Sequence, residues 1–415
     1  MVGMLLFNTL LGKVGIVAAV TVGIYAVVLG VLLTPSVQRF ALYANHFNTL
    51  FLGDDLNTGE AYGFSKHQVT PFNLSTLDGE TLYAWHVLPI DVYTRNEKMI
   101  LAEERSVGPV EDLTKTNAFR YLTQGDAKVV VTFHGNAGHI AQGWRPDTYR
   151  YLTTQPNTHV LTIDYRGFGH STGSPTEAGL IADGVALVDW VLKVAQIPPD
   201  RILILGQSLG TAVSSAVVLH FADPQNRLIP KEVRKLRPRN TEDSVFKPTV
   251  FAGVVLIAPF SSLPSLLLTY RLGGFLPILL PLRPFPNFAS ILTSQMVDKW
   301  PSAERLEAYY QSVSSQSRLL IGSDRSERSL GSIQLVHSRR DSDISYHQTE
   351  FFCRQMFRRG SGPVVGQRDR DERTGDVIEC IDGTHGPAMY EVKAKGKPKV
   401  RFEIIEHGGE YDQVL

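Results

Sequence analysis

Cysteine is nearly absent from this sequence, with only Cys353 and Cys380 among 415 residues. Two cysteines exclude a scaffold built on many disulfides, and the sequence alone does not say whether they pair. An excess of one charge is also missing, because 41 basic side chains balance 41 acidic ones. Proteins that bind nucleic acid usually carry a basic excess, so this balance argues against a nucleic-acid partner.

One long apolar run stands out near the N-terminus. Val14–Leu33 contains no charged residue, and as a helix it spans about 30 Å, the thickness of a bilayer core. It has no polar face, so a buried core helix fits poorly. It is longer than the apolar part of a typical signal peptide, and no clear cleavage site follows it. We predict an uncleaved transmembrane signal anchor, with a cleaved signal peptide as the alternative.

The charges that flank this run favour one orientation. Lys13 and the α-amine precede it, whereas Arg39, Asp54 and Asp55 follow it. The small positive excess on the N-terminal side favours a cytoplasmic N-terminus and a lumenal remainder. The sequon Asn73-Leu74-Ser75 would permit glycosylation of the lumenal part.

The rest of the chain is expected to form one large globular domain. Hydrophobic residues make up 43% of the chain and charged residues 20%, which is typical of a globular protein. The predicted organisation is a short tail, the anchor, a juxtamembrane connector and the domain, at 1–13, 14–33, 34–64 and 65–415. The connector is unusually apolar, so it either lies on the membrane surface or packs on the domain.

Strands and helices alternate from about residue 65 onward. A hairpin is predicted around Asp78-Gly79, and residues 92–127 look polar and irregular. Apolar strands are predicted at Lys128–Phe133, Val160–Tyr165, Arg201–Leu205, Phe251–Ala258, Ser332–Val336 and Val400–Ile405. Helices are predicted at Thr176–Ala195 and Tyr346–Phe357. This alternation indicates an α/β fold whose mostly parallel, doubly wound sheet is covered on both faces.

Three insertions interrupt this order. Residues 224–249 carry a basic run, expected to be a solvated loop, with a patch for anionic lipid headgroups as the alternative. Residues 358–398 are predicted to be a polar surface loop. Residues 263–310 are apolar and broken by prolines, and they follow the strand after the elbow described next. They are predicted to form a lid over a substrate, with apolar contacts from Leu267, Phe275, Leu279 and Leu282.

The most informative motif is Gly206-Gln207-Ser208-Leu209-Gly210. It lies between the predicted strand Arg201–Leu205 and an apolar helical segment that begins at Thr211. The two glycines let the chain turn sharply, so that the serine is held at the tip with its hydroxyl exposed. A strand, a sharp turn with serine and a helix together form the nucleophile elbow of an α/β-hydrolase. Ser208 is therefore the predicted nucleophile.

A serine nucleophile needs a base and an acid, which in this fold follow it in the order acid, then histidine. Asp341 comes just after the predicted strand Ser332–Val336 and is the favoured acid, with Asp343 as the alternative. His407 follows the predicted last strand and is the favoured base. His385 is the alternative base, and His347, on the helix after the acid loop, also lies beyond the acid.

The oxyanion of the tetrahedral intermediate needs two backbone N–H donors. The residue after the nucleophile, Leu209, supplies one of them. The loop His134-Gly135-Asn136-Ala137-Gly138 follows the strand Lys128–Phe133, and its small residues allow close approach to a substrate. The second donor is predicted at Asn136, with Ala137 as the fallback. His134 lies upstream of the serine and is expected to have an orienting role.

Taken together, these motifs resemble the α/β-hydrolase superfamily, and within it the membrane-anchored lysophosphatidylserine lipase and monoacylglycerol lipase type. The resemblance covers the chain from about residue 10 to 412. It rests on the anchor, the Trp85-containing strand, the His-Gly-Asn-Ala-Gly loop, Asp-Tyr-Arg-Gly-Phe-Gly, Gly-Gln-Ser-Leu-Gly and the His-x-x-x-Asp acid loop. The chain departs from this type in its longer insertions 224–249 and 358–398, and in Arg339-Arg340 where relatives are often acidic.

The resemblance implies a lipase that cleaves the acyl ester of a lysophospholipid or monoacylglycerol, with its catalytic domain on the lumenal side of the endoplasmic reticulum. A protein depalmitoylase, a thioesterase or a serine peptidase would suit the same scaffold, and so would a non-catalytic protein on a hydrolase fold. No metal-ligand spacing or phosphate-binding loop is present, so no cofactor is expected. The expected partners are the lipid substrate and the bilayer, and no obligate protein partner is evident.

Overall fold

The computed structural model describes residues 2–105, 107–236, 248–270, 279–320, 331–357, 369–370, 377–378, 380–384, 386–394 and 396–406. Three residues singled out from the sequence lie outside these ranges. They are the lid residue Phe275, the favoured base His407 and its alternative His385.

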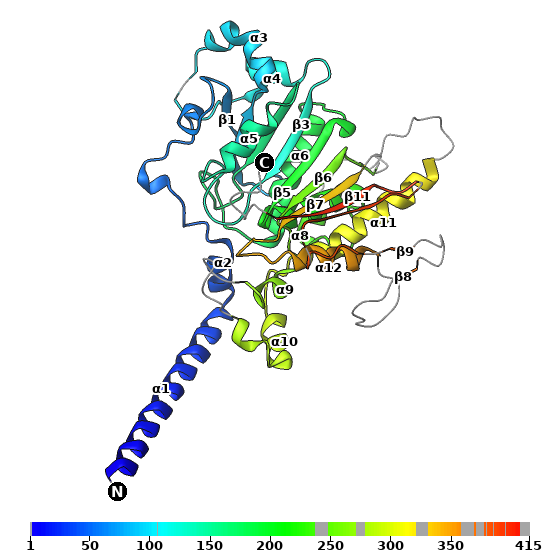
Figure 1. Cartoon of the computed structure of the whole chain (residues 1–415). Helices are drawn as coiled ribbons and strands as arrows, with labels where there is room; N and C mark the ends of the chain where they lie inside the picture. The colour runs from blue at the N-terminus through cyan, green and yellow to red at the C-terminus, as the bar shows by residue number, and fades with distance from the viewer. Residues whose placement is uncertain are drawn as a thin grey trace.

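A nine-stranded sheet forms the centre of the molecule, in the order β1-β2-β4-β3-β5-β6-β7-β11-β10 (Figure 1). The strands from β4 to β11 in this order are parallel, whereas β1, β2 and β10 run antiparallel to their neighbours. The predicted, mostly parallel α/β sheet is therefore confirmed. The strand bounds are β1 Val69–Ser75, β2 Thr81–Val87, β3 Lys128–Phe133, β4 Thr158–Ile163, β5 Ile202–Gln207, β6 Gly253–Ile257, β7 Ser332–Ser338, β10 Ala388–Val392 and β11 Val400–Ile405.

Helices cover both faces of this sheet. Alternate residues of β3 belong to different apolar clusters: Val129 and Val131 pack with α6, α7, α11 and α12, whereas Val130 packs with α5. This alternation follows from the two-residue period of a strand, which points successive side chains to opposite faces. The helix bounds are α1 Val2–Leu32, α2 Pro35–Tyr43, α3 Ile90–Leu101, α4 Asn117–Leu122, α5 Arg145–Leu152, α6 Glu177–Lys193, α7 Leu209–Ala222, α8 Lys231–Lys235, α9 Leu263–Leu267, α10 Pro286–Ser294, α11 Ser302–Leu320 and α12 His347–Phe357.

Three segments differ from the sequence-based expectation. Residues 224–249, predicted to be a solvated loop, include the short helix α8, whose Val233 is buried. Residues 92–127 are not irregular, because they contain most of α3 and all of α4. The apolar stripe of α3 is narrow, with only Val92, Tyr93 and Ile100 buried, so its helical period is weak in the sequence. The insertion 358–398 is not only a loop, since its residues Ala388–Val392 form the edge strand β10 beside β11.

The apolar insertion after β6 has a shorter lid part than predicted. Its described residues form α9, the short 3-10 helix Leu280–Leu282 and α10. The prediction extended the lid to residue 310, but α11 begins at Ser302 and buries Leu306 and Tyr309 in the main core. The sequence marks the boundary between the two parts with Asp298, Lys299 and Pro301, and the prediction extended the lid beyond it.

A disulfide joins Cys353 in α12 to Cys380, with the two Cα atoms 5.6 Å apart. It connects the helix after the acid loop to the chain that leads into β10. The sequence left this pairing open, because only the fold brings the two residues together.

The N-terminal helix α1 leaves the rest of the molecule as a long rod (Figure 1). Its segment Gly12–Leu32 is long and apolar enough to cross a membrane, and only 6% of the most apolar window is buried. A core helix would be mostly buried, so this exposure fits a membrane span. At its C-terminal end, α1 meets α2 and the helices α9 and α10 (Figure 1).

Candidate active site

Ser208 stands at the junction of β5 and α7 in a strained backbone conformation, with φ 47° and ψ −116°. A non-glycine residue in such a backbone conformation costs of order 1–3 kcal/mol, and the conformation persists only where the surrounding structure enforces it. Two glycines make this turn possible. A Cβ on Gly206 would collide with the backbone of Gly210, and a Cβ on Gly210 would collide with the carbonyl of Phe133. The tight packing of the turn on β3 therefore requires glycine at both positions.

A cavity of about 790 Å³ opens in front of this turn. That volume falls within the range of small-molecule sites. The cavity is lined by Ser208 and Leu209 from the elbow, and by Gly135, Asn136 and Ala137 from the loop after β3. The predicted nucleophile and both predicted oxyanion donors therefore border one space.

The predicted fallback donor, the Ala137 N–H, is engaged elsewhere. It donates to the carbonyl of Tyr43 at 2.9 Å, and the next N–H, of Gly138, donates to the carbonyl of Phe47 at 3.0 Å. The Asn136 side chain also donates to the carbonyl of Leu42 at 3.4 Å. The juxtamembrane segment 42–47 is thus bonded to the oxyanion loop. Of the two placements left open by the sequence, this part of the connector packs on the domain.

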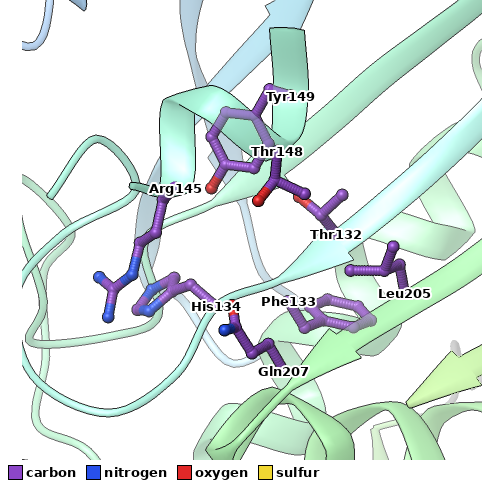
Figure 2. Close-up of a pocket in the computed structure, with 8 residues that line it drawn as sticks. All are labelled: Thr132, Phe133, His134, Arg145, Thr148, Tyr149, Leu205 and Gln207. Carbon is purple, nitrogen blue, oxygen red and sulfur yellow. The ribbon is translucent and has the colours of Figure 1, made fainter. Parts of the chain in front are cut away.

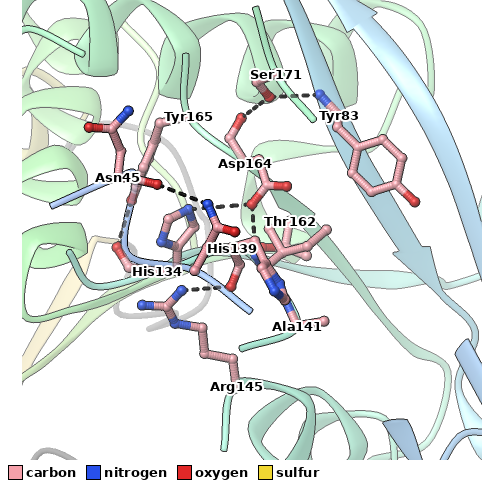
Figure 3. Close-up of polar contacts among 12 residues, drawn as sticks. Asn45, Tyr83, His134, His139, Ala141, Arg145, Thr162, Asp164, Tyr165 and Ser171 are labelled. Carbon is pink, nitrogen blue, oxygen red and sulfur yellow. Dashed lines mark hydrogen bonds and ion pairs between the residues drawn. The ribbon is translucent and has the colours of Figure 1, made fainter. Parts of the chain in front are cut away.

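Arg145, the first residue of α5, holds the same loop from the other side. Its guanidinium donates to the carbonyls of Gly135, Asn136 and Ala137 at 3.3, 2.9 and 3.0 Å. It also donates to the carbonyl of His139 at 2.6 Å (Figure 3). A planar guanidinium can bind several carbonyls at once because its donors diverge in a fixed fork. Arg145 therefore fixes the direction of these peptide groups. Sequence reasoning missed this residue, because its partners are backbone atoms without a sequence signature.

His134 is buried beside Asp164 and does not border the cavity. Its Nε2 lies 3.9 Å from an Asp164 carboxylate oxygen, which accepts a bond from the Ile140 N–H at 2.7 Å (Figure 3). Burial lowers the pKa of His134 well below its usual value, with Arg145 adding to the effect. Burial raises the pKa of Asp164 to about 7. The Nδ1 of this buried imidazole lies 2.7 Å from the Gly135 carbonyl, so His134 contacts the start of the loop from inside the domain.

A second, much smaller void of about 10 Å³ lies beneath the loop (Figure 2). It is lined by His134, Arg145, Thr148 and Gln207, among others. The Nε2 of His134 and the hydroxyl of Thr148 are buried without a hydrogen-bond partner among the described residues. A polar void of that size suits one water molecule rather than a substrate.

Asp341 lies in the turn after β7, with its side chain 1% exposed. Its carboxylate accepts bonds from the N–H groups of Asp343 and Ile344 at 3.0 and 2.8 Å. These bonds fix the carboxylate within its loop. Asp343, the alternative acid, instead borders the cavity.

The chain leaves β11 beside the acid loop. Ile405 pairs in parallel with Ser338, and the Arg339 N–H donates to the Ile405 carbonyl at 2.8 Å. Glu406, the residue before His407, forms an ion pair with Arg339 at 2.7 Å. A second contact joins Glu406 to Arg340 at 3.5 Å. The two arginines that depart from the resembled type therefore connect the acid loop to the end of β11.

Of the histidines that follow the acid in the chain, His347 is the one that lies within the described residues. It is exposed at the start of α12, where its Nδ1 lies 2.8 Å from a carboxylate oxygen of Glu350. It does not border the cavity, so its contacts match a helix-surface histidine.

The predicted lid residues fall in three different places. Leu267 and Leu279 border the cavity. Leu282 is buried in a small cluster with Leu29 of α1, while Phe275 lies outside the described residues. The cavity wall also includes Leu29, Leu32 and Leu33 at the end of α1. Nothing in the sequence predicted that the N-terminal helix would contribute to the cavity.

A mostly parallel sheet with a strained serine between its fifth strand and the following helix is the arrangement of α/β-hydrolases. Residues 129–409 match the Alpha/beta hydrolase family, and the chain belongs to that family.

Among relatives, a protein of Danio rerio named Lysophosphatidylserine lipase ABHD12 is 29% identical over 202 residues, which is 48% of this chain and 47% of that protein. Protein ABHD12B of Homo sapiens is 40% identical over 87 residues, 21% of this chain and 23% of its own length. The chain therefore spans about half the length of such relatives or less. An alpha-beta hydrolase of Vibrio vulnificus is similar in structure, with a TM-score of 0.43, 12% identity and coverage of 77% of this chain and 78% of its own.

Proposed function

We propose that this chain is a membrane-anchored serine hydrolase that cleaves the acyl ester of a lipid, either a lysophospholipid or a monoacylglycerol. The observation that carries the proposal is the strained Ser208 at the tip of the elbow, which opens on a largely apolar cavity of about 790 Å³. An acyl chain is the ligand class that such a wall favours. The similarity to relatives named lysophosphatidylserine lipase supports the same substrate class.

In the proposed first step, the Ser208 hydroxyl oxygen attacks the ester carbonyl carbon, and a new C–O bond forms. His407 accepts the hydroxyl proton, and Asp341 orients that imidazole. The carbonyl π electrons move to oxygen. The N–H groups of Leu209 and Asn136 bind the resulting oxyanion.

The intermediate then collapses and breaks the original ester C–O bond. The leaving alkoxide takes the proton from His407, and the acyl group stays on Ser208. Water attacks this acyl-enzyme with His407 as base, which releases the fatty acid and restores the serine. No metal is required for any of these steps.

A fluorophosphonate probe applied to the membrane-bound protein tests the triad. We expect labelling of the wild type and loss of labelling in the Ser208→Ala and His407→Ala variants, with a strong decrease in Asp341→Asn. Asp343→Asn is the matched control and is expected to label normally. Labelling that survives in His407→Ala would indicate that His385 is the base instead. A folded wild type that is not labelled would favour a non-catalytic protein.

The leaving group of the substrate is tested by comparing three acylated substrates with the purified protein. Release of fatty acid from lysophosphatidylserine and from a monoacylglycerol is expected in the wild type and not in Ser208→Ala. Faster cleavage of a palmitoyl-thioester peptide would instead identify a depalmitoylase.

The same proposal places the domain in the lumen of the endoplasmic reticulum. The Cys353–Cys380 disulfide supports an oxidising compartment, because such bonds persist mainly outside the cytosol. In sealed microsomes, the domain should resist added protease until detergent is present, and it should carry a glycan on the exposed Asn73. Digestion without detergent would show the opposite orientation.

A further inference from the structure

The short helix α10 packs against the end of α1 (Figure 1). Leu29 of α1 is buried in one cluster with Leu282 and with Ala289 of α10. Tyr25 of α1 and Leu292 of α10 lie against the same cluster. The lid and the anchor therefore share an apolar interface.

The position of this interface along α1 shows how deep it would lie in a bilayer that α1 crosses. Tyr25 and Leu29 both lie inside the apolar segment Gly12–Leu32. At 1.5 Å per residue, they stand about 10 Å and about 5 Å before the end of the segment. If this segment crosses a bilayer, the residues that pack on Tyr25 and Leu29 lie at the depth of the hydrocarbon.

The outer face of α10 is suited to that environment. Phe285 is 61% exposed, Phe288 48% and Ile291 61%. No charged residue occurs from residue 284 to residue 297, and Arg283 and Asp298 flank this uncharged stretch. Three large apolar side chains on one uncharged segment are unfavourable in water and favourable in lipid.

The cavity in front of Ser208 reaches the same two helices. Leu29, Leu32 and Leu33 of the anchor region and Leu292 of α10 border it. The space in front of Ser208 therefore extends to both α1 and α10.

We propose that α10 is embedded in the leaflet where α1 leaves the membrane, and that the substrate enters laterally between α1 and α10. The position of α10 follows from its packing alone, whereas lateral entry of a lipid ester rests on the proposed function. The ligand at this entrance is an acyl chain already dissolved in the leaflet, and it does not pass through water.

Spin labelling of the full-length protein in phosphatidylcholine vesicles tests the position of α10. Both native cysteines form the disulfide, so an introduced cysteine is the only free thiol. A label at Ile291→Cys is expected to be more accessible to oxygen, which dissolves in lipid, than to a water-soluble nickel complex. Leu77→Cys is the control, because Leu77 is equally exposed, at 61%, in the distant β1–β2 hairpin. Water accessibility at Ile291 equal to that at Leu77 would overturn the proposal.

Activity tests the entrance. Ile291→Asp forces a carboxylate toward the leaflet, so hydrolysis of vesicle-bound lysophosphatidylserine should fall about tenfold. Hydrolysis of a water-soluble butyrate ester should be unchanged, since Ile291 does not border the cavity. Leu77→Asp should affect neither substrate.

The outcomes separate the two proposals. An Ile291→Asp variant with wild-type activity on vesicles, or with an equal loss on both esters, would overturn lateral entry. A wild type that hydrolyses neither ester, while the Ile291 label still lies in lipid, would refute the proposed function and leave the position of α10 intact.

Discussion

At the scale of single residues, backbone groups shape the candidate site around Ser208. Ser208 is strained because Gly206 and Gly210 allow the chain to pack where no Cβ fits. The oxyanion loop is fixed by bonds to its carbonyls from Arg145. Because an oxyanion hole works by preorganised dipoles, residues that hold the loop contribute to the rate without touching the substrate.

Arg145→Lys is expected to lower kcat about 10- to 100-fold with a smaller change in KM. A lysine keeps the charge but cannot bind the carbonyls of Gly135, Asn136 and Ala137 together. The loss falls on kcat because the oxyanion contact strengthens only in the transition state. Steady-state kinetics on a soluble ester measure both constants. Arg150→Lys is the control on the same helix, and equal effects of the two substitutions would contradict this role.

At the scale of elements, the segment 42–47 is bonded to the loop after β3 that borders the cavity. Its carbonyls at Tyr43 and Phe47 accept bonds from the oxyanion loop. The segment is held in turn by Asp298, which receives bonds from the Tyr43 hydroxyl at 2.9 Å and from Arg39 at 3.2 Å. Burial and the nearby Asp298 raise the pKa of Tyr43 well above its usual value, so this hydroxyl stays a donor.

Tyr43→Phe removes one of these bonds from a buried carboxylate. The expected cost is about 1–3 kcal/mol of unfolding free energy, together with a fall in kcat because the oxyanion loop loses its support. Thermal unfolding and soluble-ester kinetics measure the two effects. Phe51→Ser, at a side chain that is 79% exposed, is the control. If Tyr43→Phe behaved like this control, the segment would have no positioning role.

The disulfide links α12 to the chain before β10. Cys353 and Cys380 are 27 residues apart, and a loop of that size corresponds to about 3–4 kcal/mol in the chain-entropy description. Replacing both cysteines by serine should lower the free energy of unfolding by about that amount, and the thermal unfolding midpoint should fall accordingly. Reductant should lower the midpoint of the wild type to that of the variant. A wild-type midpoint that is insensitive to reductant would show that the bond does not stabilise the domain.

At the scale of the whole molecule, buried histidines should control acid stability. Burial lowers the pKa of His337 to about 4 and of His159 to about 3, and the ordinary value is about 6.5. Between these limits the unfolded chain binds more protons than the folded one. The contribution of each histidine to the free energy of unfolding should therefore be greatest above about pH 6.5 and fall as the pH drops, by up to about 1.4 kcal/mol per pH unit. Asp164, whose pKa is raised to about 7 by burial, contributes with the opposite sign below that pH, so the histidine contribution is read from the difference between the wild type and a histidine variant.

Unfolding midpoints of the detergent-solubilised protein between about pH 7 and about pH 5 measure this loss. His159 pairs with His86 at 2.9 Å inside the sheet, far along the chain from the proposed triad. His159→Gln should reduce the pH dependence without abolishing activity. An unchanged pH slope in this variant would show that His159 does not titrate on unfolding.

Much of the molecule could be predicted because its signals are local. The elbow, the apolar strands and the anchor each depend on neighbouring residues, and α/β order follows from their alternation. Helix α3 and strand β10 were missed for the opposite reason. The apolar stripe of α3 is too sparse to show a period, and β10 is a half-exposed edge strand whose pairing with β11 decides its conformation.

The sequence by itself determined the family and pointed to Ser208 as the candidate nucleophile, since both follow from short motifs and their succession; the assignment of Asp341 and His407 as acid and base stays a prediction. Only the tertiary structure decided that Arg145 and the Tyr43 carbonyl hold the oxyanion loop, and that Leu29 of the anchor borders the cavity. Such contacts join residues that are far apart in the chain and involve backbone atoms or apolar surfaces. Neither leaves a pattern in the sequence, because any residue has a carbonyl and many apolar residues can fill the same wall.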